Sequence, residues 1–229
     1  MREGIEGIAF DLDGTLYPNY RFNIKLLPFI IKEMRFLSAF GKARTIIRKE
    51  QKNASSFHNT GFYDYQAEIT GKILSAPAEA IKEKIESMIY RGWEPIFKKV
   101  KLYKNVIETL NALKKEGFKL GLLSDFPPEA KLEYLGLDGI WDAVLCSERC
   151  GALKPHPLSF KELALAMGLS CEKILYVGNS RSYDVAGAAG AGMKTAWIKS
   201  PFIPGNGFKK IKSDFSFAGY RQLLRIMIR

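Results

Sequence analysis

The sequence is poor in cysteine and histidine, which excludes several classes of protein. It has only 3 cysteines and 2 histidines in 229 residues. Three cysteines are too few, and odd in number, for the disulfide framework of a small secreted domain, so we expect reduced thiols. Cys146 and Cys150 lie close together, but the histidines, His58 and His156, do not complete the ligand spacing of a structural zinc site.

Long uncharged apolar runs are also absent. The most apolar stretch near the N-terminus, residues 26–40, is interrupted by Lys32, Glu33 and Arg35. It therefore lacks the roughly 20 consecutive apolar residues that a membrane-spanning helix needs, and it predicts an amphipathic helix instead. The first residues run directly into a strand pattern, with no room for a secretory leader. We expect a cytoplasmic protein without a membrane partner.

The composition is that of an ordinary globular protein, with 47% hydrophobic and 26% charged residues. A length of 229 residues fits one domain, or a core that carries a large insert. The 35 basic residues exceed the 24 acidic ones and give a net charge of +11. An excess of this sign favours anionic partners, such as a phosphorylated metabolite in a cleft or a nucleic acid on a surface.

Short apolar strands alternate with helical patterns along most of the chain. We expect strands at 5–11, 118–123, 141–146 and 173–177, and helices at 106–116, 128–135, 159–167, 183–191 and 218–227. This alternation predicts an α/β fold with a Rossmann-like core, in which a parallel sheet lies between helices. Ligands of such sheets bind beyond the carboxyl ends of the strands, where the polar residues of this sequence fall.

Residues 18–100 interrupt the alternation, because they show only helical periodicity, as at 27–40 and 78–90. We predict an all-helical insert here, with the core formed by residues 1–17 and 101–229. Most of the excess positive charge falls in the insert. Basic stretches at 42–52 and 208–212 are not accompanied by a zinc-finger, RNA-recognition or helix-turn-helix pattern, so we do not expect a nucleic-acid partner.

Two carboxylates, Asp11 and Asp13, follow the first predicted strand. The period of a strand sends both side chains the same way until the chain turns at Gly14. Neighbouring carboxylates repel each other, which favours a bound cation or raises one pKa, and either outcome suits a nucleophile with an acid/base partner. An ordinary Asp-Gly turn is the alternative explanation of this pattern.

Four separated motifs together resemble the haloacid dehalogenase-like hydrolase superfamily, in its phosphatase form with a helical C1 cap. The motifs are Asp11-Leu12-Asp13-Gly14-Thr15, Ser124, Lys154-Pro155, and Gly178-Asn179-Ser180 with Asp184. The resemblance implies that Asp11 attacks phosphorus to form an aspartyl-phosphate and that Asp13 is the general acid/base. Ser124 would then bind a phosphoryl oxygen, and Lys154 would neutralise charge on the reacting anions.

The resemblance also implies ligands for Mg²⁺ and for substrate. It assigns Mg²⁺ to Asp11, the backbone carbonyl of Asp13, Asn179 and Asp184, and substrate contacts to Gly14, Thr15 and Asp125. The implied substrate is a small phosphorylated metabolite, either a sugar phosphate or a nucleotide. Transfer of the phosphoryl group to another hydroxyl stays open. Monomer and homodimer are equally open.

Asn179 departs from the family pattern, which commonly has an acidic residue at this position. The loss of one negative charge predicts weaker binding of Mg²⁺. It also leaves two alternatives, a metal-independent 2-haloacid dehalogenase and a catalytically impaired protein that binds ligands on the same fold. Asp13 argues against the dehalogenases, whose residue at this position is not the acid/base aspartate of the phosphatases.

Overall fold

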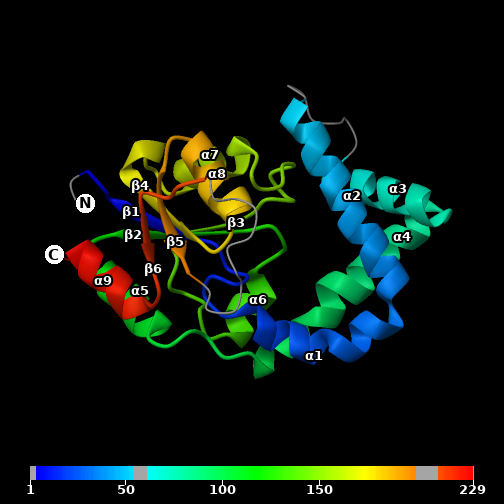
Figure 1. The fold of residues 1–229 in the computed structure, drawn as a ribbon, viewed down its shortest axis with the longest axis horizontal. Helices are drawn as coiled ribbons and strands as arrows, with labels where there is room; N and C mark the ends of the chain where they lie inside the picture. The colour runs from blue at the N-terminus through cyan, green and yellow to red at the C-terminus, as the bar shows by residue number, and fades with distance from the viewer. Residues whose placement is uncertain (1–3, 54–60, 200–210, 229) are drawn as a thin grey trace.

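The computed structural model describes residues 4–53, 61–199 and 211–228. Within these residues, six parallel strands form one sheet in the order β3-β2-β1-β4-β5-β6. The strands are β1 (Gly7–Phe10), β2 (Lys119–Ser124), β3 (Ala143–Cys146), β4 (Ile174–Gly178), β5 (Lys194–Ile198) and β6 (Phe215–Phe217). Figure 1 shows the helices of the core on both sides of this sheet, which confirms the predicted fold class.

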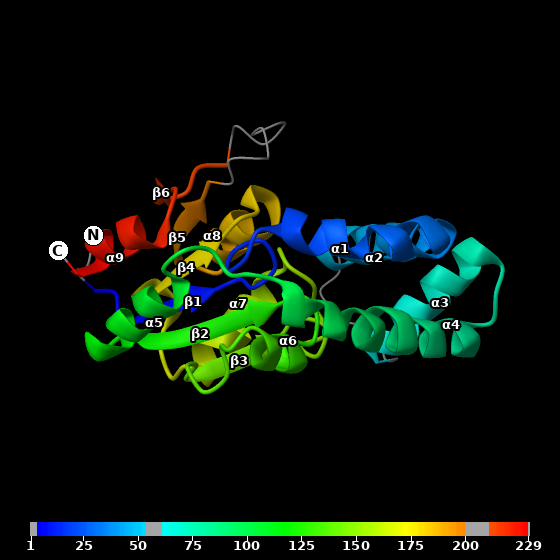
Figure 2. The same ribbon diagram turned by 90° about the horizontal axis from the view of Figure 1, so that it is seen from below.

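Alternating side chains of the central strand bury the two faces of the sheet in different cores. Ile8 and Phe10 belong to the core cluster under one set of helices, and Ala9 belongs to the cluster on the other face. The first set is α5 (Val106–Lys115), α6 (Glu129–Tyr134) and α9 (Tyr220–Ile228), and the second is α7 (Pro157–Ala166) and α8 (Ala186–Gly190). Figure 2 shows α5 and α9 together at the end of the core that carries both termini.

The four predicted strands are present, but the sequence analysis missed β5 and β6. β5 follows α8 and so continues the strand–helix alternation, and the strand prediction omitted it. β6 has only 3 residues, too few to show the period of a strand. The helix predicted over 183–191 is a π-helical turn, η4 (Arg181–Val185), that continues into α8. A short 3₁₀ turn, η3 (Cys171–Lys173), precedes β4.

Every element described between residues 18 and 100 is helical, as predicted. The elements of this helical insert are α1 (Asn19–Lys32), α2 (Met34–Asn53), α3 (Phe62–Leu74), α4 (Ala78–Lys84), the π-helix η1 (Ile85–Arg91) and the 3₁₀ helix η2 (Glu94–Lys99). The prediction of one helix over 27–40 is wrong, because the chain leaves helical geometry at Glu33, where φ is −111° and ψ is 22°. Pro28 lies in the last turns of α1 and cannot donate a backbone hydrogen bond there.

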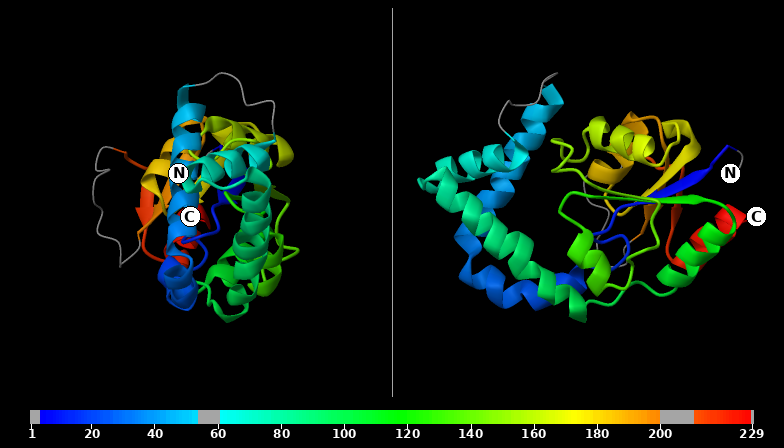
Figure 3. Two further views of the ribbon diagram at one scale, coloured as in Figure 1. Left: turned by 90° about the vertical axis from the view of Figure 1, so that its right-hand side faces the viewer. Right: turned by 180° about the vertical axis from the view of Figure 1, so that it is seen from behind.

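The helical insert leaves the core after β1 and returns to it before α5. Figure 3 shows its helices curving away from the sheet and back. The two connections lie together, since the Tyr103 amide donates to the Leu16 carbonyl at 2.9 Å and Arg21 donates to the Lys101 carbonyl at 2.9 Å. The helical insert has an apolar cluster of its own, made of Phe36, Phe40, Ala67, Ile81, Ile85 and Ile89.

The sequence analysis also singled out His58 and a second basic stretch at 208–212. His58 and residues 208–210 lie outside the described residues. Among the described helices, none combines the length and the apolar character needed to cross a bilayer. Cys146, Cys150 and Cys171 are free thiols, in agreement with the expectation from the cysteine count.

Candidate active site

The strand order reverses beside β1, which has β2 on one side and β4 on the other. Loops that leave neighbouring strands in opposite directions open a crevice at their carboxyl ends, and open α/β sheets bind their ligands there. Asp11 and Asp13 follow β1, Ser124 ends β2, and Asn179 follows β4. The topology therefore gathers residues from three separate motifs at one edge of the sheet.

Lys154 lies between two buried carboxylates. Its Nζ is 2.6 Å from Oδ1 of Asp11 and 2.8 Å from Oδ1 of Asp184. Burial opposes the charge of the lysine, but these two carboxylates raise the pKa of Lys154 well above its ordinary value. The pKa of Asp11 is raised to about 7, chiefly by burial and then by the charge of Asp184, while Lys154 acts in the opposite direction. One ammonium thus holds two carboxylates, and its role toward a phosphoryl group stays a prediction.

The oxygen atoms around Asp11 fit a hard cation. The Thr15 hydroxyl donates to Oδ2 of Asp11 at 2.7 Å and lies 3.5 Å from Oδ1 of Asn179. Two buried carboxylates against one ammonium leave negative charge that a cation would balance, and Mg²⁺ prefers such oxygen ligands. The described residues contain no group of three or more His, Cys, Asp or Glu suited to a metal, so a site here depends on amide and backbone oxygens as well.

Gly14 allows Asn179 to approach the turn after Asp13. Its φ is +92°, a conformation that other residues rarely adopt, and a Cβ at this position would lie 2.2 Å from Nδ2 of Asn179. The side chain of Asn19, at the start of α1, would lie 2.6 Å from the same Cβ. Gly14 therefore allows close packing around the turn, and its contact with substrate stays a prediction.

Asp13 is held by a lysine and a tyrosine that the sequence analysis did not select. Nζ of Lys131 lies 2.9 Å and 2.8 Å from the two carboxylate oxygens of Asp13, and the Tyr17 hydroxyl donates to the same carboxylate. Burial acts to raise the pKa of Asp13, but Lys131 and Tyr17 outweigh it and hold the pKa below the ordinary value. The Ser124 hydroxyl lies 3.4 Å from Asp13. Asp13 is therefore an anion that can accept a proton.

Lys131 carried no sequence signal, because a single lysine in a short amphipathic helix ordinarily faces solvent. In the structure it is 8% exposed, and its ammonium lies 5.2 Å from the ring centroids of both Phe97 and Phe126. Phe97 belongs to η2 of the helical insert, whereas Lys131 belongs to α6 of the core. Only the packing of these two elements brings the lysine to Asp13.

Asp125 bonds to protein groups on both of its oxygens. Oδ1 accepts from the Lys154 amide at 3.2 Å, and Oδ2 accepts from Arg48 of α2 at 2.7 Å. Burial acts to raise the pKa of Asp125, but Lys154, Arg44 and Arg48 hold it below the ordinary value. In this conformation the carboxylate supports the loop that carries Lys154. A direct contact between Asp125 and substrate stays a prediction.

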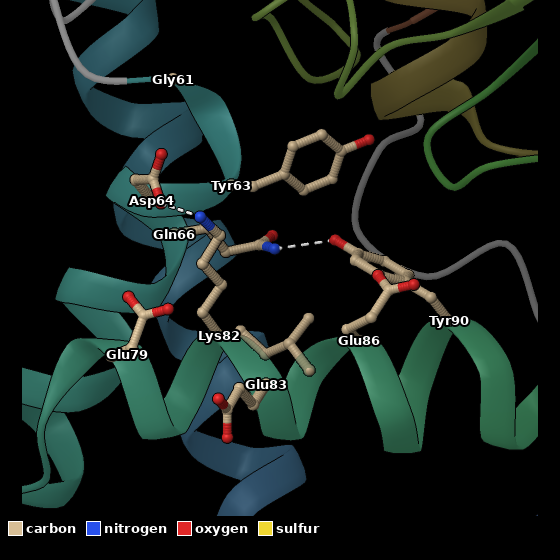
Figure 4. Close-up of a pocket in the computed structure, with 10 residues that line it drawn as sticks. Gly61, Tyr63, Asp64, Gln66, Glu79, Lys82, Glu83, Glu86 and Tyr90 are labelled. Carbon is tan, nitrogen blue, oxygen red and sulfur yellow. Dashed lines mark hydrogen bonds and ion pairs between the residues drawn. The ribbon is translucent and has the colours of Figure 1, made fainter.

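A cavity of about 470 Å³ lies in the helical insert, between α3 and α4–η1. Figure 4 shows the Tyr63 ring extending from α3 and the Tyr90 hydroxyl directed toward Gln66, which donates to it at 2.9 Å. The Tyr90 ring also meets Phe126, the residue after Asp125, at a centroid distance of 6.3 Å. Tyr90, which lines the cavity, thus contacts the core loop that follows β2, while all the lining residues belong to the helical insert.

Comparisons with known proteins agree with this geometry. A family model described as haloacid dehalogenase-like hydrolase matches residues 5–192. A glyceraldehyde 3-phosphate phosphatase of Methanocaldococcus jannaschii is 32% identical over 200 residues, with 85% of each chain covered. A phosphoglycolate phosphatase of Haemophilus influenzae is 28% identical over 235 residues, covering 96% of this chain and 97% of the relative.

The fold is also similar to that of a 2-haloacid dehalogenase from Pseudomonas syringae pv. Tomato DC3000. The TM-score is 0.64, the sequence identity is 21%, and the match covers 97% of this chain and 98% of the dehalogenase. At this identity the similarity extends to the fold alone. The choice of reaction therefore depends on the residues in the crevice.

Proposed function

Because the chain belongs to the haloacid dehalogenase-like hydrolases, we propose that it hydrolyses a small phosphomonoester through an aspartyl-phosphate on Asp11. The observation that carries this proposal is the buried Asp11 carboxylate held by Lys154, with the ionised Asp13 nearby. A nucleophile, a cation to neutralise it and an acid/base group are the parts that covalent phosphoryl transfer needs. Release of phosphate from an aryl phosphate, with and without Mg²⁺, tests the proposal.

In the first half of the proposed reaction, an oxygen of Asp11 forms a bond to phosphorus while the bond to the leaving oxygen breaks. Asp13, an anion in the free site, takes up a proton from solvent when the anionic substrate binds and gives it to that oxygen, so that the leaving group departs as an alcohol. The ammonium of Lys154, 2.6 Å from Asp11, offsets the repulsion between carboxylate and phosphate. The Ser124 hydroxyl is fully buried at the end of β2 and is the proposed donor to a phosphoryl oxygen.

In the second half, water attacks phosphorus and the bond between phosphorus and the Asp11 oxygen breaks. Asp13 accepts a proton from this water, and Lys131 and Tyr17, which bond to the Asp13 carboxylate, keep it ionised and oriented before this step. Phosphate and the free Asp11 carboxylate result, and Asp13 returns its proton to solvent as phosphate leaves, which restores the starting state. A sugar hydroxyl in place of water would give phosphotransfer by the same route.

The proposed metal ligands are Asp11, the Asp13 backbone carbonyl, Asn179 and Asp184. Bound there, Mg²⁺ would draw negative charge from the phosphoryl oxygens and favour attack at phosphorus. Asn179 contributes a neutral oxygen, so the site has one negative charge fewer than a site with aspartate at this position.

An Asn179→Asp variant is expected to bind Mg²⁺ about tenfold more tightly, because the added carboxylate lies beside Asp11 and supplies the missing charge. The affinity can be measured by isothermal titration calorimetry with Mg²⁺ alone, which needs no substrate. An Asp138→Asn variant changes an exposed aspartate away from the crevice and serves as the control. An Asn179→Asp variant with unchanged affinity would show that Asn179 does not contact the metal.

We propose that the helical insert, residues 18–100, acts as a cap over the crevice. The relatives named for glyceraldehyde 3-phosphate and phosphoglycolate support a small metabolite, such as a sugar phosphate, as the substrate class. The free thiols of the described cysteines support a cytoplasmic location. The chain would work there as a monomer or a homodimer.

A metal-independent 2-haloacid dehalogenase is the second candidate, favoured by Asn179. In that reaction the Asp11 carboxylate would attack carbon and displace halide. Asp13, with its lysine and tyrosine partners, has no evident use there, because halide leaves without a proton. Asp13 therefore favours the phosphatase.

A further inference from the structure

One face of α2 in the helical insert holds the core loop that carries Lys154. Arg44, Arg48 and Gln51 have the i, i+4, i+7 spacing that places side chains on one side of a helix. Gln51 donates to the Gly151 carbonyl at 2.8 Å and accepts from the Leu153 amide at 3.1 Å. The loop after β3 is thus bonded to a helix that lies about 100 residues earlier in the chain.

Arg48 holds both backbone groups of Lys154, one directly and one through Asp125. Its Nε donates to the Lys154 carbonyl at 2.8 Å, and its Nη2 donates to Oδ2 of Asp125 at 2.7 Å. The other oxygen of Asp125 accepts from the Lys154 amide at 3.2 Å. The guanidinium also lies 4.5 Å from the ring centroid of Tyr183, which limits its movement. Because these two donors lie in the rigid plane of the guanidinium, they fix both the distance and the orientation of the Lys154 carbonyl and of Asp125 relative to Arg48.

Arg44 anchors the beginning of the same loop. It donates to Gln66 of α3 at 2.9 Å and forms an ion pair with Glu148, and both members of the pair are buried. Its second nitrogen lies 3.5 Å from Asp125. The Arg44–Glu148 pair and the bonds of Arg48 therefore attach the loop to α2 at two points, one near its beginning and one at Lys154. A shift of α2 would therefore move the backbone of Lys154.

The position of that backbone matters for the ammonium at the end of the lysine side chain. Nζ must stay within bonding distance of Asp11 and Asp184, now 2.6 Å and 2.8 Å away. We propose that Arg48 is a positioning residue, through which the helical insert sets Lys154 against Asp11. Arg48 bonds to Lys154 and Asp125 and not to Asp11, so it acts on the reaction through these two residues. The catalytic part of this inference rests on the proposed phosphatase function.

The kinetic test compares Arg48→Ala with the wild type in the hydrolysis of an aryl phosphate. We expect kcat to fall between about ten- and 100-fold, the usual cost of a misplaced catalytic group, while KM changes much less. Free guanidinium ion should restore part of the lost kcat, because it can occupy the space between Asp125 and the Lys154 carbonyl. Arg35→Ala, an exposed arginine of the same helix, is the matched control and should leave kcat unchanged with or without guanidinium.

Amide hydrogen exchange tests the structural part without any substrate. In Arg48→Ala, the amides of Leu153 and Lys154 should exchange at least about tenfold faster, while amides of the central strand β1 keep their wild-type rates. Unchanged exchange at these two amides would overturn the inference even if the wild type hydrolyses no phosphate. In an active wild type, an unchanged kcat, or a loss that guanidinium does not restore, would overturn it as well.

Discussion

Replacing Asp11 by asparagine is expected to reduce the hydrolysis of an aryl phosphate by at least about 10⁴-fold, the scale of losing a catalytic nucleophile. An amide has no anionic oxygen to attack phosphorus, and neither neighbouring carboxylate can take its place. Asp184 is fully buried and bonded to Lys154 and the Ser180 amide, while Asp13 is held by Lys131. Phosphate release at saturating Mg²⁺ is the measurement.

The same variant separates catalysis from folding. Burial and the charge of Asp184 disfavour ionised Asp11, so its replacement by a neutral amide should not lower the free energy of unfolding. Urea unfolding of Asp11→Asn should therefore match the wild type or exceed it in midpoint. Asp138→Asn, on the surface, should retain full activity. A folded Asp11→Asn protein that keeps even one tenth of the activity would exclude Asp11 as the nucleophile.

Replacing Lys154 by methionine is expected to reduce kcat by between about 10²- and 10³-fold, because the reacting anions lose their fixed positive charge. This variant should also lose stability, since Asp11 and Asp184 remain buried without the ammonium between them. Methionine keeps most of the length and apolar volume of the side chain, which limits changes in packing. The kinetic effect is measured as phosphate release below the unfolding transition.

Lys115→Met, an exposed lysine at the end of α5, is the matched control and should change neither kcat nor the unfolding midpoint. Lowering the pH should stabilise Lys154→Met relative to the wild type, because the uncompensated carboxylates can then take up protons. A Lys154→Met variant with wild-type kcat would show that the lysine has a structural role only.

The sequence predicted the parts of this site that are encoded by local patterns. Asp11, Ser124 and Asn179 each end or follow a strand, and the carboxyl ends of parallel strands share one edge of the sheet, so the strand pattern is enough to predict that these residues lie together. Lys154 and Asp184 were identified through the family resemblance, and the fold gives them a common partner, since Lys154 bonds to both Asp11 and Asp184.

The parts that could not be predicted depend on packing between distant elements. Lys131 reaches Asp13 because α6 lies under η2, and Arg48 reaches Lys154 because α2 turns one face toward a loop of the core. A basic residue in an amphipathic helix gives no sign of which partner it will meet. The bonds of Asp125 to Arg48 and Lys154 illustrate the same limit, because they appear only in three dimensions.

The most direct test of the account is the hydrolysis of an aryl phosphate by the purified protein, once with Mg²⁺ and once with a chelator, beside the same assay for halide release from a 2-haloacid. We predict phosphate release that requires Mg²⁺, and no halide release under either condition. Halide release in the presence of the chelator, without phosphate release at any Mg²⁺ concentration, would contradict the proposed function and identify the protein as a dehalogenase.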